Sequence, residues 1–158
     1  MANILLIYQS NTGNTKTMAE AVAKGARSAG VDVDIKPLAQ ASVDDLPQYD
    51  GIIIGTPTHF ASMTADVKRF IDDSIKYYKK LQGKVGAAFS SSGDLGGGAE
   101  TAVLDILRAF WVHGMIVPGY ETGGHYGPVS VGAPDDDRKE VCEQMGAQVA
   151  KLVLRLND

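Results

Sequence analysis

The chain has 158 residues, of which 44% are hydrophobic and 22% are charged. This length fits one domain with its own core, and no repeat or linker divides it, so residues 1–158 are predicted to form a single domain. The formal net charge of −4 argues against binding to nucleic acid or to an anionic membrane surface. The lone cysteine, Cys142, excludes an internal disulfide and any metal site built on cysteine pairs, and we expect no bound metal.

No apolar run reaches the length of a membrane-spanning helix. The first residues, Met1–Ile4, lack the basic segment and cleavage site that mark a secretion signal. We therefore expect a cytoplasmic protein that does not associate with membranes.

Apolar runs predict the strands. Three runs are typical of strands buried on both faces: Asn3–Tyr8, Gly51–Gly55 and Val85–Phe89. Val31–Ile35 alternates apolar and acidic residues, as a half-exposed edge strand does. Met115–Val117 is the fifth predicted strand.

Apolar residues at helical spacing lie between these runs and predict four helices. Their stripes contain Met18, Val22 and Ala26; Val67, Phe70 and Ile71; Val103, Leu107 and Phe110; and Val141, Met145 and Val149. Thr64 is expected to cap the second helix, and Gly114 to end the third. Ser42–Pro47 holds at most a short helical turn.

Strands that alternate with helices predict an α/β fold, with a parallel sheet covered by helices on both faces. Five strands in this rhythm fit the doubly wound order 2-1-3-4-5. In that order ligands bind beyond the carboxyl ends of the strands, where the first and third strands lie side by side. The loops after the first, third and fourth strands are therefore the candidate site.

Ser10–Thr15 joins the first strand to the first helix and is made of Ser, Thr, Gly and Asn. A helix start presents unpaired N–H groups and a partial positive charge, both of which favour a phosphate group. Hydroxyls can donate to phosphate oxygens, and Gly13 lets the backbone approach closely. Composition alone leaves a second interpretation open, an ordinary loop in which Asn14 or Thr15 caps the helix.

Three other nucleotide or phosphate folds do not fit. A Walker loop requires Gly before its Lys-Ser/Thr pair, whereas Lys16 follows Asn-Thr. The dinucleotide-binding Gly-x-Gly-x-x-Gly does not follow the first strand. A response-regulator receiver needs carboxylates at the ends of the first and third strands, and Tyr8–Ser10 and Gly55–Pro57 contain none.

Leu6–Thr15 resembles the flavodoxin signature, whose Thr/Ser-x-Thr-Gly-x-Thr loop holds the phosphate of flavin mononucleotide (FMN). Gly55–Met63 is similar to the ring-binding loop of flavin quinone reductases of the tryptophan-repressor-binding-protein type, with Gly-Thr-Pro-Thr-x-Phe. Ser90–Gly98 resembles the Ser-Ser-Thr-Gly…Gly-Gly-Gly loop of the same reductases, with one extra residue near Asp94-Leu95. The match of residues within Gly93–Gly97 to the positions of the reductase loop can therefore shift by one residue.

The resemblance implies a flavodoxin-like three-layer sandwich with FMN as cofactor, and it implies a set of flavin contacts. The implied contacts are Ser10, Asn11, Thr12, Gly13, Asn14 and Thr15 at the phosphate, and Pro57, Thr58, His59, Phe60, Ser91, Ser92, Gly93, Gly96 and Gly97 near the ring. Trp111–Met115 resembles the family's His-Gly-Met, which adds His113 as a flavin contact. The alternative for His113 is a helix-end residue that interacts with the helix dipole.

The flavin supplies the redox chemistry, so no catalytic acid, base or nucleophile is expected in the protein. Our first hypothesis is an enzyme that takes electrons from NAD(P)H and reduces a quinone, because Ser90–Gly98 contains no aromatic residue to cover the ring. The second is a carrier of single electrons between redox proteins. The short segment between Ile35 and Gly51 favours the carrier, since it lacks the insertion usual in the reductases. A flavodoxin-like module without flavin is a third reading, which three intact loops disfavour.

The expected partner is accordingly a small acceptor such as a quinone, or another redox protein. The family resemblance suggests a homodimer or a tetramer. The missing insertion, which the reductases use in tetramer assembly, leaves a monomer equally open.

Overall fold

Five parallel strands form a single sheet in the computed structural model, which describes residues 1–158. The strands are β1 (Asn3–Tyr8), β2 (Asp32–Pro37), β3 (Gly51–Pro57), β4 (Val85–Ser92) and β5 (Val129–Val131). Their order is β2-β1-β3-β4-β5, which confirms the predicted doubly wound topology. β1 and β3 lie side by side at the centre, where the strand order reverses.

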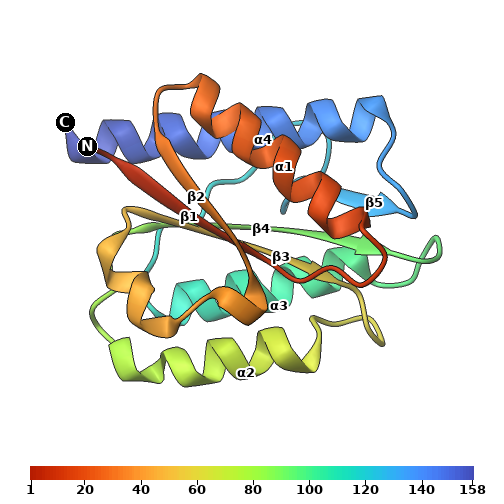
Figure 1. Ribbon diagram of the computed structural model, residues 1–158, viewed down its shortest axis with the longest axis horizontal. Helices are drawn as coiled ribbons and strands as arrows, with labels where there is room; N and C mark the ends of the chain where they lie inside the picture. Colours follow the sequence, from red (N-terminus) through yellow and green to blue (C-terminus); the bar gives the residue numbers. More distant parts are fainter.

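Helices cover both faces of the sheet, as Figure 1 shows. α1 (Asn14–Ser28) and α4 (Asp136–Asn157) lie on one face, and α2 (Ala65–Asp73) and α3 (Ala99–Val112) lie on the other. Three short 3₁₀ helices complete the chain: η1 (Leu38–Gln40), η2 (Val43–Gln48) and η3 (Ser74–Tyr77). None of the helices combines the length and the apolar character that crossing a membrane requires.

The two faces of the sheet bury two separate apolar cores. In β1, Ile4 and Leu6 belong to the core under α1 and α4, whereas Leu5 and Ile7 belong to the core under α2 and α3. Alternate residues of a strand point to opposite faces, so a strand covered on both sides must be apolar throughout. This explains the continuous apolar runs from which the strands were predicted.

α1 and α4 approach each other closely at two glycines. A Cβ atom on Gly25 would lie 1.9 Å from the carbonyl oxygen of Glu143, and one on Gly146 would lie 2.0 Å from that of Val22. Each glycine therefore lets the backbone of one helix contact the backbone of the other.

The prediction for the fifth strand is wrong. Met115–Val117 forms no strand, and Ile116 makes only an isolated bridge beside Val85. Gly86 N donates to the Ile116 carbonyl, and Ile116 N donates to the Lys84 carbonyl, both at 2.9 Å. The strand β5 lies beside the other end of β4, paired with Ser90–Ser92. Pro118 cannot donate to a ladder, so the chain leaves the sheet after Val117 and returns to it at Val129.

The predicted helix ends are confirmed. The Thr64 side chain accepts a hydrogen bond from Val67 N and caps α2, and Gly114 follows α3 with a φ of 75°. Ser42 caps the short helix η2.

Cys142 is fully buried in α4, and burial raises the pKa of its thiol to about 12, so it packs rather than reacts.

Gly146→Ala tests the close contact between α1 and α4. Alanine in a helix is normally more stable than glycine by about 1 kcal/mol, but here the added Cβ would collide with backbone. We expect the variant to lower the free energy of unfolding by about 1–3 kcal/mol, as overpacking does, measured by urea denaturation. Gly93→Ala is the control, because its Cβ would meet nothing within 4 Å. A more stable Gly146→Ala protein would contradict this packing.

Candidate functional site

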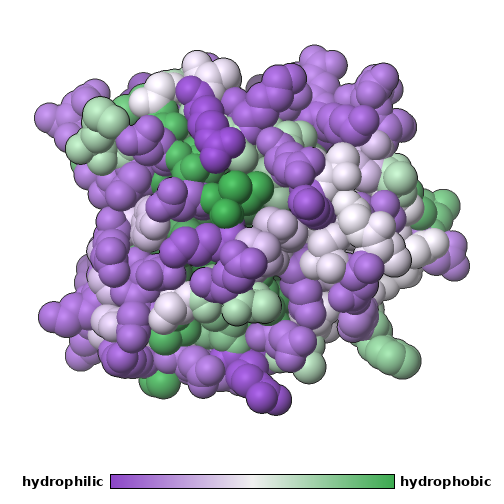
Figure 2. All heavy atoms as spheres, in the orientation of Figure 1, coloured by the Kyte–Doolittle hydropathy of each residue, from purple (hydrophilic) through white to green (hydrophobic).

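The candidate site lies at the edge of the sheet where the carboxyl ends of all strands meet. Three segments converge there: the β1 loop (Ser10–Thr15), the β3 loop (Thr58–Met63) and the β4 loop (Gly93–Gly98), which together we call the loop cluster. In Figure 1 this is the right-hand edge, opposite the two chain termini. The same edge is pale in Figure 2, because the loops are rich in residues of intermediate hydropathy such as Gly, Ser and Thr.

The β1 loop is closed by one side chain. The Ser10 hydroxyl oxygen accepts hydrogen bonds from the backbone N–H of Gly13, at 3.1 Å, and of Lys16, at 3.2 Å. Gly13 has a φ of 96°, a left-handed conformation that glycine adopts without strain, and it precedes the first residue of α1. The Ser10 hydroxyl proton remains free to donate to a ligand.

The start of α1 presents unpaired donors. The backbone N–H groups of Asn11, Thr12, Asn14 and Thr15 donate to no protein group. The N-cap residue is Gly13, and the side chain that accepts from the first turn of α1 is that of Ser10, through Lys16 N. The alternative prediction, a cap by Asn14 or Thr15, is therefore wrong. Unpaired N–H groups at a helix start, with the positive end of the helix dipole behind them, form an arrangement that binds anions.

The β3 loop contains a tight, strained turn. His59 and Ser62 exchange two backbone hydrogen bonds of 2.9 and 3.0 Å, which leaves Phe60 and Ala61 as the central residues. Both have positive φ, 48° and 62°, as a two-residue type I′ turn requires. For residues other than glycine this backbone costs about 1–2 kcal/mol each. The turn leaves the Phe60 side chain fully exposed at the site.

Contacts with the start of α3 hold this turn in place. The Thr101 hydroxyl donates to the Ala61 carbonyl at 2.6 Å, and the Ser62 hydroxyl donates to Asp105 at 2.6 Å. A Cβ on Gly98 would lie 2.4 Å from the Ala61 Cα, so glycine is required for this approach. Backbone strain persists where surrounding contacts determine the conformation, and this is often the case at binding sites.

Hydroxyl pairs join the β1 loop and the β3 loop to the end of β4 beneath the surface. The side chains of Thr15 and Ser91 form a hydrogen bond of 2.8 Å, and those of Thr58 and Ser90 form one of 2.9 Å. Thr58 N also donates to the Ser91 carbonyl at 2.8 Å. Thr15 is buried, so its hydroxyl holds the end of β4 in place, while its backbone N–H has no protein partner.

The β4 loop is exposed and rich in glycine. Gly96 and Gly98 have positive φ, 74° and 94°, and Gly97 N donates to the Asp94 carbonyl at 3.1 Å. Ser92 lies at the end of β4 and its hydroxyl also donates to Asp94, at 3.0 Å. Leu95, which is 86% exposed, is the one large side chain of this loop.

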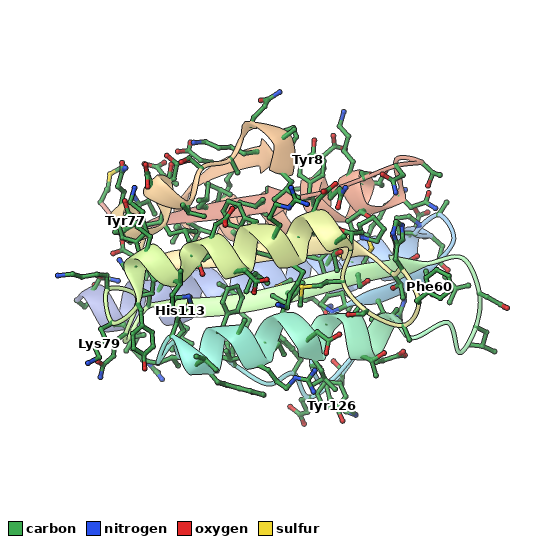
Figure 3. The ribbon with its side chains drawn as sticks, turned by 90° about the horizontal axis from the view of Figure 1, so that it is seen from below. Tyr8, Phe60, Tyr77, Lys79, His113 and Tyr126 are labelled. Atoms are coloured by element: carbon green, nitrogen blue, oxygen red, sulfur yellow. The ribbon has the colours of Figure 1, made fainter.

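The structure does not bring His113 to the loop cluster. It follows the last residue of α3, a helix of 14 residues whose two ends are therefore about 21 Å apart. Figure 3 shows His113 and Phe60 at opposite ends of the molecule. The Ser74 hydroxyl donates to the Ile71 carbonyl at 2.6 Å, so His113 Nε2 donates to Ser74 at 2.8 Å. Desolvation lowers the pKa of His113.

The sequence did not reveal Gln9 as a positioning residue. Its side-chain oxygen accepts from the Thr64 hydroxyl, and its side-chain nitrogen donates to Asp66 at 3.2 Å. Gln9 thereby fixes the start of α2 against the end of β1. No local pattern indicates a contact between residues 55 positions apart.

The chain matches the Flavodoxin family over residues 6–108. The chain belongs to the flavodoxin family. It is 35% identical over 190 aligned positions to an NAD(P)H dehydrogenase (quinone) of Archaeoglobus fulgidus, covering 99% of this chain and all of the relative. It is 39% identical over 162 positions to a flavodoxin of Aquifex aeolicus, covering 97% of this chain and 88% of the relative.

Solved structures of flavodoxins share the fold over nearly the whole chain. The crystal structure of the flavodoxin, WrbA-like protein of Agrobacterium tumefaciens superposes with a TM-score of 0.84 at 27% identity, covering 98% of this chain and 99% of the other. A flavodoxin from the domain Archaea gives a TM-score of 0.80 at 28% identity, covering 96% and 99%. The flavodoxin-like sandwich predicted from the sequence is thus confirmed.

Thr15→Val and Ser91→Ala test the hydroxyl pair that joins the β1 loop to β4. Each single variant leaves one buried hydroxyl without a partner, so we expect each to lower the free energy of unfolding by about 1–3 kcal/mol. The double variant removes both hydroxyls and should lose less than the sum of the two single losses. Urea denaturation of all four proteins measures the coupling. Strictly additive losses would show that the pair makes no net interaction.

Proposed function

We propose that the loop cluster binds FMN with its phosphate on the β1 loop. The observation that carries the proposal is the set of unpaired backbone N–H groups of Asn11, Thr12, Asn14 and Thr15 at the start of α1. An anion at a helix start needs no cationic side chain, because N–H groups and the helix dipole supply the attraction. The free Ser10 proton and the open backbone at Gly13 add a donor and room to approach.

The ring of the flavin is proposed to lie between the β3 and β4 loops. The backbone after Pro57, at Thr58 and His59, offers polar groups to the ring edge, and the exposed Phe60 provides an aromatic surface beside it. Across from them, Gly93, Gly96 and Gly97 form a wall of small residues that permits close approach, and Ser91 and Ser92 lie buried at the end of β4 beside it. The residues present therefore fit the cofactor that flavodoxins are named for.

We propose further that the protein is an oxidoreductase that passes electrons from NAD(P)H to a quinone. Bound FMN would supply the redox chemistry that links hydride donation by NAD(P)H to the two-electron, two-proton reduction of a quinone. The protein binds and orients both partners. The β4 loop contains no aromatic side chain, so it leaves the outer face of the ring open for a nicotinamide or quinone to stack. The relative of A. fulgidus carries the name of this activity.

An electron carrier is the second candidate, and a specific observation favours it. The flavodoxin of A. aeolicus aligns over 162 positions, so it matches this chain almost without insertions. The alignment with the A. fulgidus relative needs 190 positions, so that relative contains segments absent here. In the carrier a redox protein, rather than a quinone, would face the open side of the ring.

Anaerobic titration of the FMN-loaded protein separates the two candidates. We expect NADH or NADPH to bleach the flavin absorbance in a single two-electron stage, and a quinone to restore it. If neither nicotinamide changes the flavin absorbance, and dithionite reduces the flavin in two one-electron stages, the protein is a carrier instead. A protein that stays colourless after mixing with FMN would refute the proposal as a whole.

Ser10→Ala tests the phosphate end of the proposed site. The change removes one donor to the phosphate and the two bonds that close the β1 loop, so we expect the FMN dissociation constant to rise about tenfold. Riboflavin lacks the phosphate, and its affinity should change little. Quenching of flavin fluorescence measures both, with Ser42→Ala as a control that keeps the β1 loop intact. An equal loss for both flavins would place Ser10 away from the phosphate.

A further inference from the structure

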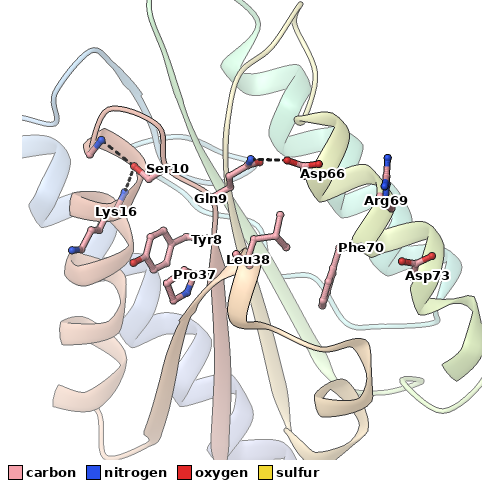
Figure 4. A pocket seen from close by; sticks show the side chains of 12 residues that line it. Tyr8, Gln9, Ser10, Lys16, Pro37, Leu38, Asp66, Arg69, Phe70 and Asp73 are labelled. Carbon is pink, nitrogen blue, oxygen red and sulfur yellow. Dashed lines mark hydrogen bonds between the residues drawn. The ribbon is translucent and has the colours of Figure 1, made fainter.

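A hollow opens beside the β1 loop, at the ends of β1 and β2. It is a cleft of about 580 Å³ between η1 and α2, shown in Figure 4, and we call it the η1–α2 cleft. It is lined in part by Ser10 and Gly13 of the β1 loop, but no residue of the β3 or β4 loop lines it. The cleft therefore borders the proposed phosphate end of the flavin and lies outside its ring site.

The floor of the cleft is apolar and partly aromatic. Tyr8 and Pro37 come from the ends of β1 and β2, where Figure 4 shows them next to each other, and Leu38 and Phe70 complete the floor. Phe70 is 9% exposed and belongs to the core under α2, so the floor is a fixed part of the fold. A flat heteroaromatic ring can bury its faces against such a surface.

Two cations without ion-pair partners flank this floor. Lys16 on α1 and Arg69 on α2 lie on opposite sides of the cleft, and neither forms an ion pair in the structure. Two carboxylates, Asp66 and Asp73, also line the α2 wall. Asp66 accepts a hydrogen bond from Gln9 and lies in the first turn of α2, where the helix dipole offsets its charge.

This lining suits a phosphorylated nucleoside better than a simple anion. The apolar floor matches the base, cations on two sides match phosphates at separate positions, and the Asp66 carboxylate can accept from a ribose hydroxyl. A bare inorganic anion would meet the carboxylates without the benefit of the floor. Guanidinium groups bind phosphate through paired hydrogen bonds, so the unpaired Arg69 is the more selective of the two cations.

We infer that the η1–α2 cleft binds the phosphoadenosine half of the nicotinamide donor, with Arg69 selecting the 2′-phosphate of NADPH over NADH. The inference rests on the proposed function, because it assigns a place to that reaction's electron donor. A dinucleotide whose nicotinamide reaches the flavin ring would run along the flavin toward the β1 loop. Its adenosine end then lies at the cleft, which begins at Ser10 and Gly13.

Adenosine 2′,5′-bisphosphate is the probe for the cleft, titrated into the FMN-loaded protein by calorimetry. We expect Arg69→Ala to weaken binding about tenfold, because a charge-assisted hydrogen bond is lost. Asp73→Asn removes a repelling charge and should strengthen binding instead. Arg155→Ala is the matched control: it removes an exposed arginine at the far end of α4 and should leave binding unchanged.

Two further readouts separate this inference from its rivals. Arg69→Ala should raise the KM for NADPH with little change in kcat and little change in the KM for NADH. Its FMN dissociation constant should equal that of the unaltered protein; a matching loss of FMN affinity would assign Arg69 to the flavin and overturn the inference.

The two proposals fail in different ways. If NADPH reduces the flavin while Arg69→Ala and Asp73→Asn leave bisphosphate binding unchanged, the cleft is not the donor site and the proposed function stands. Suppose instead that Arg69→Ala weakens and Asp73→Asn strengthens bisphosphate binding, while neither nicotinamide reduces the flavin. Then the cleft binds phosphoadenosine and the proposed oxidoreductase activity is wrong.

Discussion

The parallel direction of all five strands is the constraint on which the candidate site depends. Because every strand ends at the same edge, segments separated by dozens of residues in the sequence become neighbours there. β1 and β3 pair directly, as do β3 and β4, so the loops that follow them must lie side by side. The crossover helices then leave on both faces, which opens the edge between β1 and β3 and exposes the start of α1.

The architecture was predictable because helix and strand periods alternate clearly, and continuous apolar runs such as Asn3–Tyr8 occur where a strand is covered on both faces. The fifth strand was misassigned for a physical reason. Two short segments lie beside β4, Ile116 at one end and Val129–Val131 at the other, and the more apolar of the two makes only a bridge. Which segment forms the ladder depends on where Pro118 diverts the chain.

The loops of the site were predictable from their position, but their internal geometry was not. Phe60 and Ala61 occupy a type I′ turn, for which Asn-Gly is the usual sequence. Because Phe-Ala is not a typical turn sequence, their left-handed backbone could not be predicted from the local sequence. The pairing of Thr15 with Ser91 joins hydroxyls 76 positions apart, and it exists only once the sheet register is set. Any serine or threonine in these loops looks the same in the sequence, whether it faces a ligand or fixes the scaffold.

The division of labour among these hydroxyls bears on how the site would work. Thr15 bonds to Ser91 and Thr58 bonds to Ser90, so these four hydroxyls fix the scaffold beneath the β1 and β3 loops rather than face a ligand. The β4 loop differs, because it is exposed and internally joined by few bonds to Asp94. A rigid phosphate end beside an open, small-residue wall favours tight retention of a cofactor together with access for a second molecule. That combination is required both for an enzyme that binds a quinone and for a carrier that docks a protein. A cleft that binds the phosphoadenosine half of a nicotinamide donor would serve only the enzyme. The charge of Arg69, across the cleft from Lys16, is therefore a feature of this chain that favours a nicotinamide-dependent oxidoreductase over a carrier.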